Sequence, residues 1–365
     1  MSQDIRFGMY TEFQCPQGVP HAKIVNDIME VAVNLDDNGF DTFCSLEHPF
    51  FQEFAVNIAP LSVFSALAQR TQNIRFRCLC HTLPLHNPMI LSGQIAQTDI
   101  LTGGRLDVGV GRGHAWLQEP ANVSFEESQG RFEECFDILL KGWNEERFSY
   151  DGKYYQCNDL AIVPKPVQEN IPVYVVGTSG KQFKRAAENS WSIVVGGPVP
   201  SPAFFGPMQD YRDLCAEVGT KPKIGFIKAI YLDEDGDRAL EEAEDYVVKF
   251  ERFNFLPLEA VPNKSEAEKQ RLRNAGFGFY ADILPSMPAL KWTYEEMLAE
   301  KVVYVGTPET VAQELLELYD DSGGFNELII MSHYGGIDKD RAIRTQDLFA
   351  KHVMPVFRDY VTNKS

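Results

Sequence analysis

Short apolar runs alternate along most of the chain with longer segments whose apolar residues recur at helical spacing. Ile24, Ile28, Val31 and Leu35 give one such helical stripe, and Asn38-Gly39 follows as a stop signal. Near-continuous apolar runs are typical of strands that are buried on both faces of a parallel sheet. The predicted strands are Ile5–Tyr10, Phe40–Leu46, Ile74–Thr82, Arg105–His114, Pro172–Thr178, Ser192–Gly197, Ile224–Leu232 and Glu327–Ser332.

Eight strand-then-helix units predict an α/β fold, a (β/α)8 TIM barrel, as one domain over residues 1–365. A doubly wound open sheet is the alternative. The segment from Phe148 to Gln156 predicts a small hairpin that turns at Asp151-Gly152.

A long insertion over residues 234–301 follows the seventh predicted strand. Loops of this length are usually functional or disordered. Gly276 and Gly278 are candidate hinges, and Phe277, Phe279, Tyr280 and Trp292 offer apolar cover. We expect a lid over the barrel mouth, with a peripheral helical excursion as the alternative.

Glu47-His48-Pro49 ends the second predicted strand abruptly, because proline cannot donate a backbone hydrogen bond. Active sites of α/β barrels are built at the carboxyl ends of the strands. Glu47 and His48 are therefore candidate catalytic residues, and simple capping of the strand is the alternative.

Two further strand ends carry residues suited to an anion. Gly111-Arg112-Gly113 ends the fourth strand, where Arg112 can fork onto a phosphate or pair with a carboxylate. Thr178, Ser179 and Gly180 lie between the fifth strand and a helix, where amides and hydroxyls hold anions or cap the helix. Together these ends favour a phosphate-bearing ligand.

The net charge of the chain argues against two classes of binding partner, nucleic acids and anionic membranes. The net charge is −18, from 34 basic and 52 acidic residues, so we expect no binding to nucleic acid or to anionic membranes. The chain starts directly with a predicted strand and has no apolar run of membrane-spanning length, which favours a cytoplasmic protein.

Seven cysteines, an odd number placed mostly in apolar runs, predict free thiols in a reducing compartment. Cys78 and Cys80 alternate along a predicted strand and would share a face. Without a second pair at ligand spacing they are weak zinc ligands, so we predict no metal site.

Several segments also occur in the order and spacing of one known family. They are Gly39–Thr42 leading to Leu46-Glu47-His48, Glu53-Phe54, Gly104–Gly113, Pro172–Val176, Val305–Glu309 and Val353–Pro355. On these segments the chain resembles the bacterial luciferase-like monooxygenases, flavin-dependent (β/α)8 proteins, along nearly its whole length. It most resembles the luciferase catalytic subunit.

The resemblance implies reduced flavin mononucleotide (FMN), which reacts with oxygen at ring carbon C4a to give a peroxyflavin. His48 matches the catalytic histidine and Glu47 its acidic neighbour. The positions that match cofactor contacts are Arg112, Thr178, Ser179 and Gly180 for the phosphate, Leu79-Cys80 where the family often has a cis peptide against the flavin, and Gly111 beside C4a. The glycine is expected to open space there.

The chain departs from luciferase at Pro49, which replaces a second histidine, and at Thr178, which replaces a glutamate. These departures weaken the case for light emission more than that for flavin binding. The resemblance thus implies a two-component monooxygenase that uses reduced FMN and O2 on a hydrophobic, carbonyl-type substrate. A separate flavin reductase would supply the cofactor, and the chain would form a homodimer or a heterodimer with a related subunit.

Two alternatives stay open. Some relatives use the deazaflavin F420 for hydride transfer without oxygen. The luciferase second subunit exemplifies a non-catalytic flavin-binding partner, against which the match at Glu47, His48 and Arg112 argues. The aromatic residues near the mouth, Phe50, Phe51, Phe54 and Trp116, favour a hydrophobic substrate, or else belong to the core or a dimer face.

Overall fold

Eight parallel strands close into a barrel in the computed structural model, which describes residues 5–177, 180–256, 265–283 and 292–364. Strand β9 pairs with β8 on one edge and with β11 on the other, and β11 pairs with β1, so the sheet has no open ends. The prediction of a (β/α)8 barrel is therefore confirmed, and the open-sheet alternative is wrong. The barrel strands are β1 (Arg6–Thr11), β2 (Thr42–Ser45), β3 (Arg75–Thr82), β4 (Leu106–Gly111), β7 (Val173–Val176), β8 (Ser192–Gly196), β9 (Ile224–Leu232) and β11 (Glu327–Met331).

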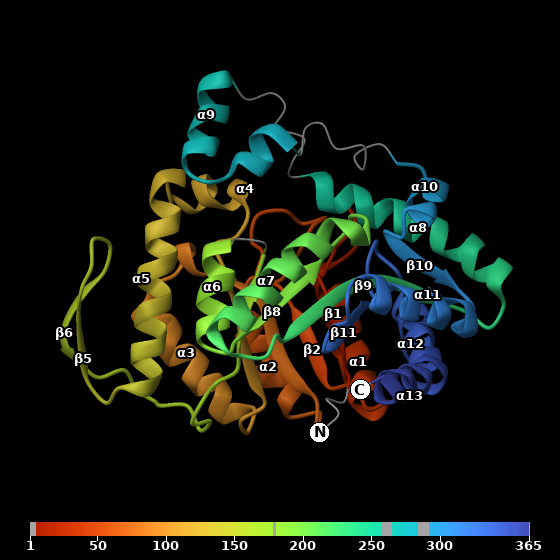
Figure 1. The fold of residues 1–365 in the computed structure, drawn as a ribbon, viewed down its shortest axis with the longest axis horizontal. Coiled ribbons are helices and arrows are strands. Elements are labelled where there is room, and N and C mark those ends of the chain that lie inside the picture. The colour runs from red at the N-terminus through yellow and green to blue at the C-terminus, as the bar shows by residue number, and fades with distance from the viewer. Residues whose placement is uncertain (1–4, 178–179, 257–264, 284–291, 365) are drawn as a thin grey trace.

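Helices surround the barrel and connect successive strands (Figure 1). Local caps begin several of them: Pro88 opens α3 behind the cap Asn87, and Thr307 caps α11 by accepting from the amide of Thr310. The helices are α1 (His21–Asp37), α2 (Pro60–Ala68), α3 (Pro88–Leu101), α4 (Ala115–Gln118), α5 (Phe125–Asn144), α6 (Gly180–Glu188), α7 (Phe205–Val218), α11 (Pro308–Asp321), α12 (Lys339–Leu348) and α13 (Met354–Lys364). None of the described helices is long and apolar enough to cross a membrane.

Two small strand features lie outside the barrel. The predicted hairpin is confirmed as β5 (Phe148–Asp151) and β6 (Gln156–Leu160), which project from the side of the molecule (Figure 1). Strand β10 (Val303–Gly306), which the sequence analysis did not predict, pairs with the last part of β9 beyond its contact with β8.

Buried charges hold the barrel interior together near its amino-terminal end. Arg77 donates to Glu327 at 2.8 Å and to Asp107 at 2.9 Å, and its guanidinium lies 3.5 Å from the ring centre of Tyr174. These residues come from β3, β11, β4 and β7. Because the ion pairs join strands that are distant in the sequence, they link parts of the wall that the helices do not.

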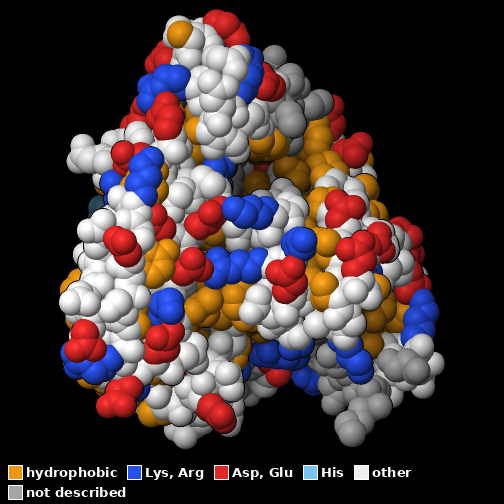
Figure 2. All heavy atoms as spheres, turned by 60° about the vertical axis from the view of Figure 1, so that its left-hand side comes forward, with side chains coloured by type: hydrophobic (Ala, Val, Ile, Leu, Met, Phe, Trp, Pro, Cys, Tyr) orange, Lys and Arg blue, Asp and Glu red, His pale blue; other side chains and the backbone are white. Residues whose placement is uncertain are grey.

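The long insertion contributes α8 (Gly236–Phe255), α9 (Glu266–Asn274), the π-helical turn η5 (Phe279–Ile283) and α10 (Tyr294–Ala299). Helix α9 stands above the barrel, and both chain termini lie at the other end of the view (Figure 1). Figure 2 shows the surface hollowed beneath this segment, with hydrophobic side chains gathered around the hollow. The carboxyl ends of the strands open on this side.

Candidate functional site

His48 lies just beyond β2 and is 3% exposed. Its amide donates to the carbonyl of Asn57 at 2.8 Å, and the Asn57 side chain donates to the Leu46 carbonyl at 3.0 Å. These bonds hold the chain extended where Pro49 ends the strand. The imidazole is thus fixed at the barrel mouth, as the sequence predicts.

The hydrogen bond of the His48 ring defines its tautomer. The indole nitrogen of Trp116 can only donate, and it lies 3.3 Å from Nε2 of His48. Nε2 is therefore the acceptor, and the proton sits on Nδ1, which is buried without a partner among the described residues. Burial, together with His114 nearby, lowers the pKa of His48 well below its usual value, so the ring is neutral.

Aromatic rings surround His48. The ring centre of Phe54 lies 4.2 Å from that of His48, and His114 stacks on Trp116 at 4.0 Å. Nδ1 of His114 bonds the hydroxyl of Tyr280 at 2.8 Å, and burial lowers the pKa of His114 to about 4. Since Tyr280 belongs to the insertion, this apolar cluster joins the barrel mouth to the segment above it.

The carboxylate of Glu47 has different partners from the adjacent His48 side chain. Its carboxylate lies 2.8 Å from Nε2 of His86 and 3.3 Å from Nδ1 of His81. Burial alone raises the pKa of Glu47, but hydrogen bonds from the two histidines outweigh it and lower the pKa to about 2. Glu47 is thus an ionised carboxylate held by β3 and the turn after it. Sequence reasoning did not identify His81 or His86.

Arg112 follows β4 and faces the insertion. It donates to the carbonyls of Ala275 and Gly276, both at 2.7 Å, and stacks 3.7 Å from the ring centre of Phe277. Within the described residues it pairs with no carboxylate, and burial lowers its pKa. A half-buried arginine without a counter-charge suits a phosphate, and the salt-bridge alternative from the sequence does not apply within this part of the chain.

The backbones of β3 and β4 approach closely beside the mouth. The Leu79-Cys80 peptide bond is cis, and the register with β4 shifts between Cys78 and His81, so β3 is irregular at this point. A Cβ on Gly111 would lie 2.2 Å from Sγ of Cys80. The expectation that Gly111 opens space is therefore wrong: the Cys80 thiol already occupies it.

The predicted phosphate loop is only partly described. Thr178 and Ser179 lie outside the described residues, while Gly180 is the first residue of α6. A Cβ at Gly180 would meet nothing within 4 Å. Its surroundings therefore leave room at a helix N-terminus, a position that favours anions.

Glu12 is a buried acid that sequence reasoning missed. It directly follows β1 and accepts from Gln14 at 2.8 Å and from Asn254 of α8 at 3.1 Å. Burial raises its pKa to about 8 against these hydrogen bonds. The signal that identified Glu47, an acid at the carboxyl end of a strand, also applies to Glu12.

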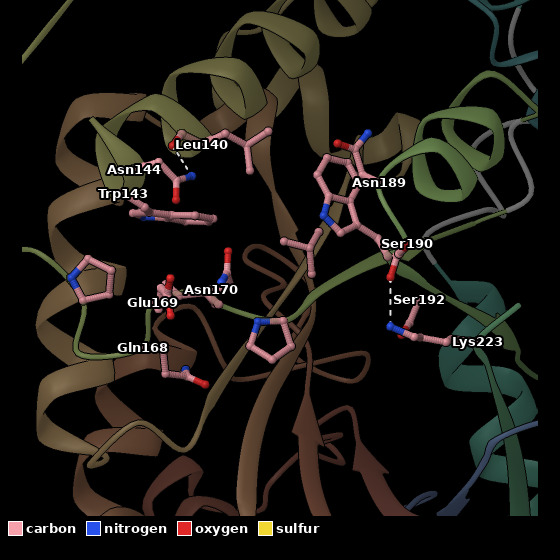
Figure 3. Close-up of a pocket in the computed structure, with 15 residues that line it drawn as sticks. Leu140, Trp143, Asn144, Gln168, Glu169, Asn170, Asn189, Ser190, Ser192 and Lys223 are labelled. Carbon is pink, nitrogen blue, oxygen red and sulfur yellow. Dashed lines mark hydrogen bonds between the residues drawn. The ribbon is translucent and has the colours of Figure 1, made fainter. Parts of the chain in front are cut away.

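A cavity of about 590 Å³ lies at the other end of the barrel (Figure 3). Its lining includes Pro172, which precedes β7, Ser192, which begins β8, and Lys223, which precedes β9. Trp143 and Asn144 of α5 close its side. None of the predicted site residues that the structure describes lines this cavity, so it is separate from the candidate site at the mouth.

Comparisons with known proteins give two kinds of relative. The chain is 24% identical to 2,5-diketocamphane 1,2-monooxygenase 1 of Pseudomonas putida, covering 90% of this chain and 93% of the relative. It is 25% identical to an F420-dependent glucose-6-phosphate dehydrogenase of Segniliparus rotundus, covering 91% and 94%. Sequence identity alone does not separate an oxygenase from a hydride-transfer enzyme.

Solved structures support the fold. The oxygenating constituent of 3,6-diketocamphane monooxygenase from Pseudomonas putida, a type II Baeyer-Villiger monooxygenase in complex with FMN, superposes with a TM-score of 0.78. The identity is 21%, over 96% of this chain and 98% of that chain. A family model described as luciferase-like monooxygenase matches residues 5–325. This chain belongs to the luciferase-like monooxygenase family.

Proposed function

We propose that this chain is the oxygenase component of a two-component monooxygenase that uses reduced FMN and O2 on a hydrophobic carbonyl substrate. The observation that carries the proposal is the Nδ1–H of His48, which is buried among aromatic rings at the barrel mouth and has no partner among the described residues. The FMN-bound structural relative and the diketocamphane monooxygenase support the cofactor and the substrate class.

The residues present suit this cofactor. Arg112, without a carboxylate partner among the described residues, and the amino end of α6 at Gly180 would hold the phosphate, with Thr178 and Ser179 as the matched loop residues. Leu79-Cys80 and Gly111 would lie against the ring system. When bound, the reduced flavin supplies the oxygen chemistry.

His48 acts as a hydrogen-bond donor in this proposal. Trp116 occupies Nε2 and leaves Nδ1–H for a group bound at the mouth. A neutral imidazole in a dry pocket can donate a hydrogen bond through this N–H without carrying a charge. Glu47, ionised and held by two histidines, fixes the end of β2 rather than exchanging protons near neutral pH.

The insertion serves as the lid. Its residues Ala275 and Gly276 accept from Arg112, and Tyr280 contacts His114. The aromatic cluster beneath it excludes water from the mouth, and this exclusion limits side reactions of reactive species with water. Residues 257–264 and 284–291 of the insertion lie outside the described residues.

The test is anaerobic titration with photoreduced FMN, followed by mixing with oxygenated buffer and a panel of cyclic ketones. We expect binding, and substrate oxygenation that consumes O2. Arg112→Ala should weaken reduced FMN binding by at least about tenfold, the loss of a charged hydrogen bond. His48→Ala should lower kcat on the order of 100-fold.

The matched control is Arg147→Ala. This arginine is exposed and pairs with Asp159 of the β5–β6 hairpin, not with a residue of the candidate site. The variant should leave binding and turnover unchanged. Unaltered turnover in His48→Ala would overturn the role of His48 and favour a non-catalytic partner subunit.

Hydride transfer with F420 is the second candidate, favoured by the relatives that use it. Binding of F420 without binding of FMN in either redox state would establish it in place of the monooxygenase. Light scattering of the purified chain, alone and with a flavin reductase, would test the proposed dimer and the proposed partner.

A further inference from the structure

Three potential metal ligands converge beside the end of β2. Nδ1 of His81 and Nε2 of His86 face the carboxylate oxygens of Glu47, and all three ligand atoms lie within 4.8 Å of one another. His81 comes from β3, and His86 follows the short helix η1 (Leu83–Leu85). The cluster therefore joins the end of β2 to a His81–His86 pair with four residues between its members, and only the fold shows that Glu47 faces this pair.

The distances suit a coordination sphere. Oε2 of Glu47 lies 2.9 Å from Nε2 of His86 and 3.3 Å from Nδ1 of His81. Ligand atoms held about 2.0–2.2 Å from one four- or six-coordinate ion stand roughly 2.8–3.6 Å apart. Two edges of such a sphere are thus already present, and closing the third requires only the two imidazoles to approach each other.

The environment favours a bound ion over water. The side chains of His81, Glu47 and His86 are 2%, 7% and 23% exposed, so the site is dry but reachable on the His86 side. Glu47 supplies a negative charge at an effective dielectric well below that of water, which strengthens attraction to a cation. An opening at His86 gives an entry path.

The framework holds the ligands in place before any ion binds. The backbone next to Glu47 is fixed by the bond from the His48 amide to Asn57. The carbonyl of His86 accepts from the hydroxyl of Tyr155 at 3.1 Å, and Asn87 caps α3. A preorganised site loses little conformational entropy when it binds a ligand.

The donor set defines the class of ion. Two imidazoles and one carboxylate suit divalent first-row transition ions, whereas oxygen-only sites suit Mg²⁺ and Ca²⁺.

We propose that Glu47, His81 and His86 bind one divalent first-row transition-metal ion with three protein ligands and an open position. The competing account is a hydrogen-bonded cluster in which both histidines donate to Glu47. The inference concerns the protein without flavin, so it stands or falls independently of the proposed monooxygenase activity.

The experiment uses untagged, flavin-free, chelator-treated protein titrated with Co²⁺ and, separately, with Zn²⁺ by calorimetry. One equivalent of each ion should bind, with visible Co²⁺ absorption bands. Glu47→Gln and His86→Ala should each weaken binding at least about tenfold, in the range seen when metal-site residues are altered. His21→Ala, which removes an exposed histidine from α1, is the matched control and should bind normally.

A second measurement needs no variant. X-ray absorption of the Zn²⁺-loaded wild-type protein should show two imidazole ligands and one carboxylate. Failure of the wild type to bind either ion, equal binding by Glu47→Gln and wild type, or a zinc spectrum without two imidazoles would overturn the proposal and leave the hydrogen-bonded cluster.

Discussion

At the scale of single residues, most of the histidines cluster near the carboxyl ends of the barrel strands. His48, His81, His86, His114 and His333 all lie within, or shortly after, the carboxyl-terminal part of a barrel strand. Their states differ because their partners differ. His48 accepts from Trp116, His81 and His86 face a carboxylate, and His333 has no side-chain partner among the described residues.

His333 gives a pH prediction for stability. Burial lowers its pKa to about 4, against a usual 6.5, while Asp27, Lys23 and Asp338 are the charged groups that act on it. Between these values the unfolded chain binds a proton that the folded chain does not. Stability should therefore be full above about pH 6.5 and fall as the pH drops toward 4.

Urea unfolding across this pH range measures the effect. Relative to His333→Gln, the wild type should lose on the order of 2 kcal/mol more free energy of unfolding between pH 7 and pH 4. His114 contributes similarly in both proteins and cancels in the difference. Equal pH dependence in the two proteins would show that His333 is charged or solvated when folded.

Gly111 and Cys80 show that the structural role of a residue depends on its neighbours in the fold. From the sequence, Gly111 suggests open space beside a cofactor. In the structure, its missing Cβ makes room for Sγ of Cys80 from the neighbouring strand. A glycine at a strand end can thus leave space for a ligand or make room for a side chain of the neighbouring strand. Only the position of that neighbouring strand shows which of the two applies.

The strands and helices largely follow local signals at the scale of secondary-structure elements. Strand β9 has the predicted bounds, because its apolar run is local. Helix α3 is likewise bounded by local residues, the cap Asn87 and the C-cap Thr102. The exceptions are β10, which forms only because β9 extends past β8, and the π-helical turn η8 (Phe349–Val353) within the final helical segment. Both depend on packing.

Helix α9 gives a prediction for the insertion. Arg112 forks onto the carbonyls at the end of α9, and Arg271 of α9 pairs with Glu126 on the exposed surface. In flavin-free protein, Arg112→Ala should speed amide exchange across residues 266–283 at least about tenfold, since charged hydrogen bonds contribute more than neutral ones.

Arg271→Ala serves as the comparison for this experiment, because an exposed ion pair contributes about 0–1 kcal/mol. It should change exchange of the same residues much less. If both variants behave alike, Arg112 does not hold the insertion, and the aromatic contacts of Tyr280 and Phe277 carry it instead.

Buried ion pairs join distant strands at the scale of the whole molecule. Arg77 of β3 bonds Asp107 of β4 and Glu327 of β11, which follow it by 30 and 250 residues. The pairs thus contribute to closing the barrel between its first and last parts. Replacing the arginine leaves Glu327 in a low dielectric without its hydrogen-bonded counter-charge, whereas Asp107 keeps its pair with Arg75.

Arg77→Met should therefore lower the free energy of unfolding by about 3–5 kcal/mol, the usual cost of breaking a buried pair. Urea denaturation monitored by circular dichroism measures it. Arg147→Ala, which removes an exposed pair with Asp159, should change stability by less than about 1 kcal/mol. A loss below 1 kcal/mol in Arg77→Met would mean that the interior is hydrated.

The sequence by itself determined the order of strands and helices, the polar ends of β2 and β4, the free cysteines and the family. These features are encoded by residues near one another in the chain. Only the tertiary structure decided that Glu47 turns to His81 and His86, that the Cys80 thiol fills the space beside Gly111, and that Arg112 contacts the insertion. Those contacts join distant segments, and their energies depend on burial and approach that no local pattern contains.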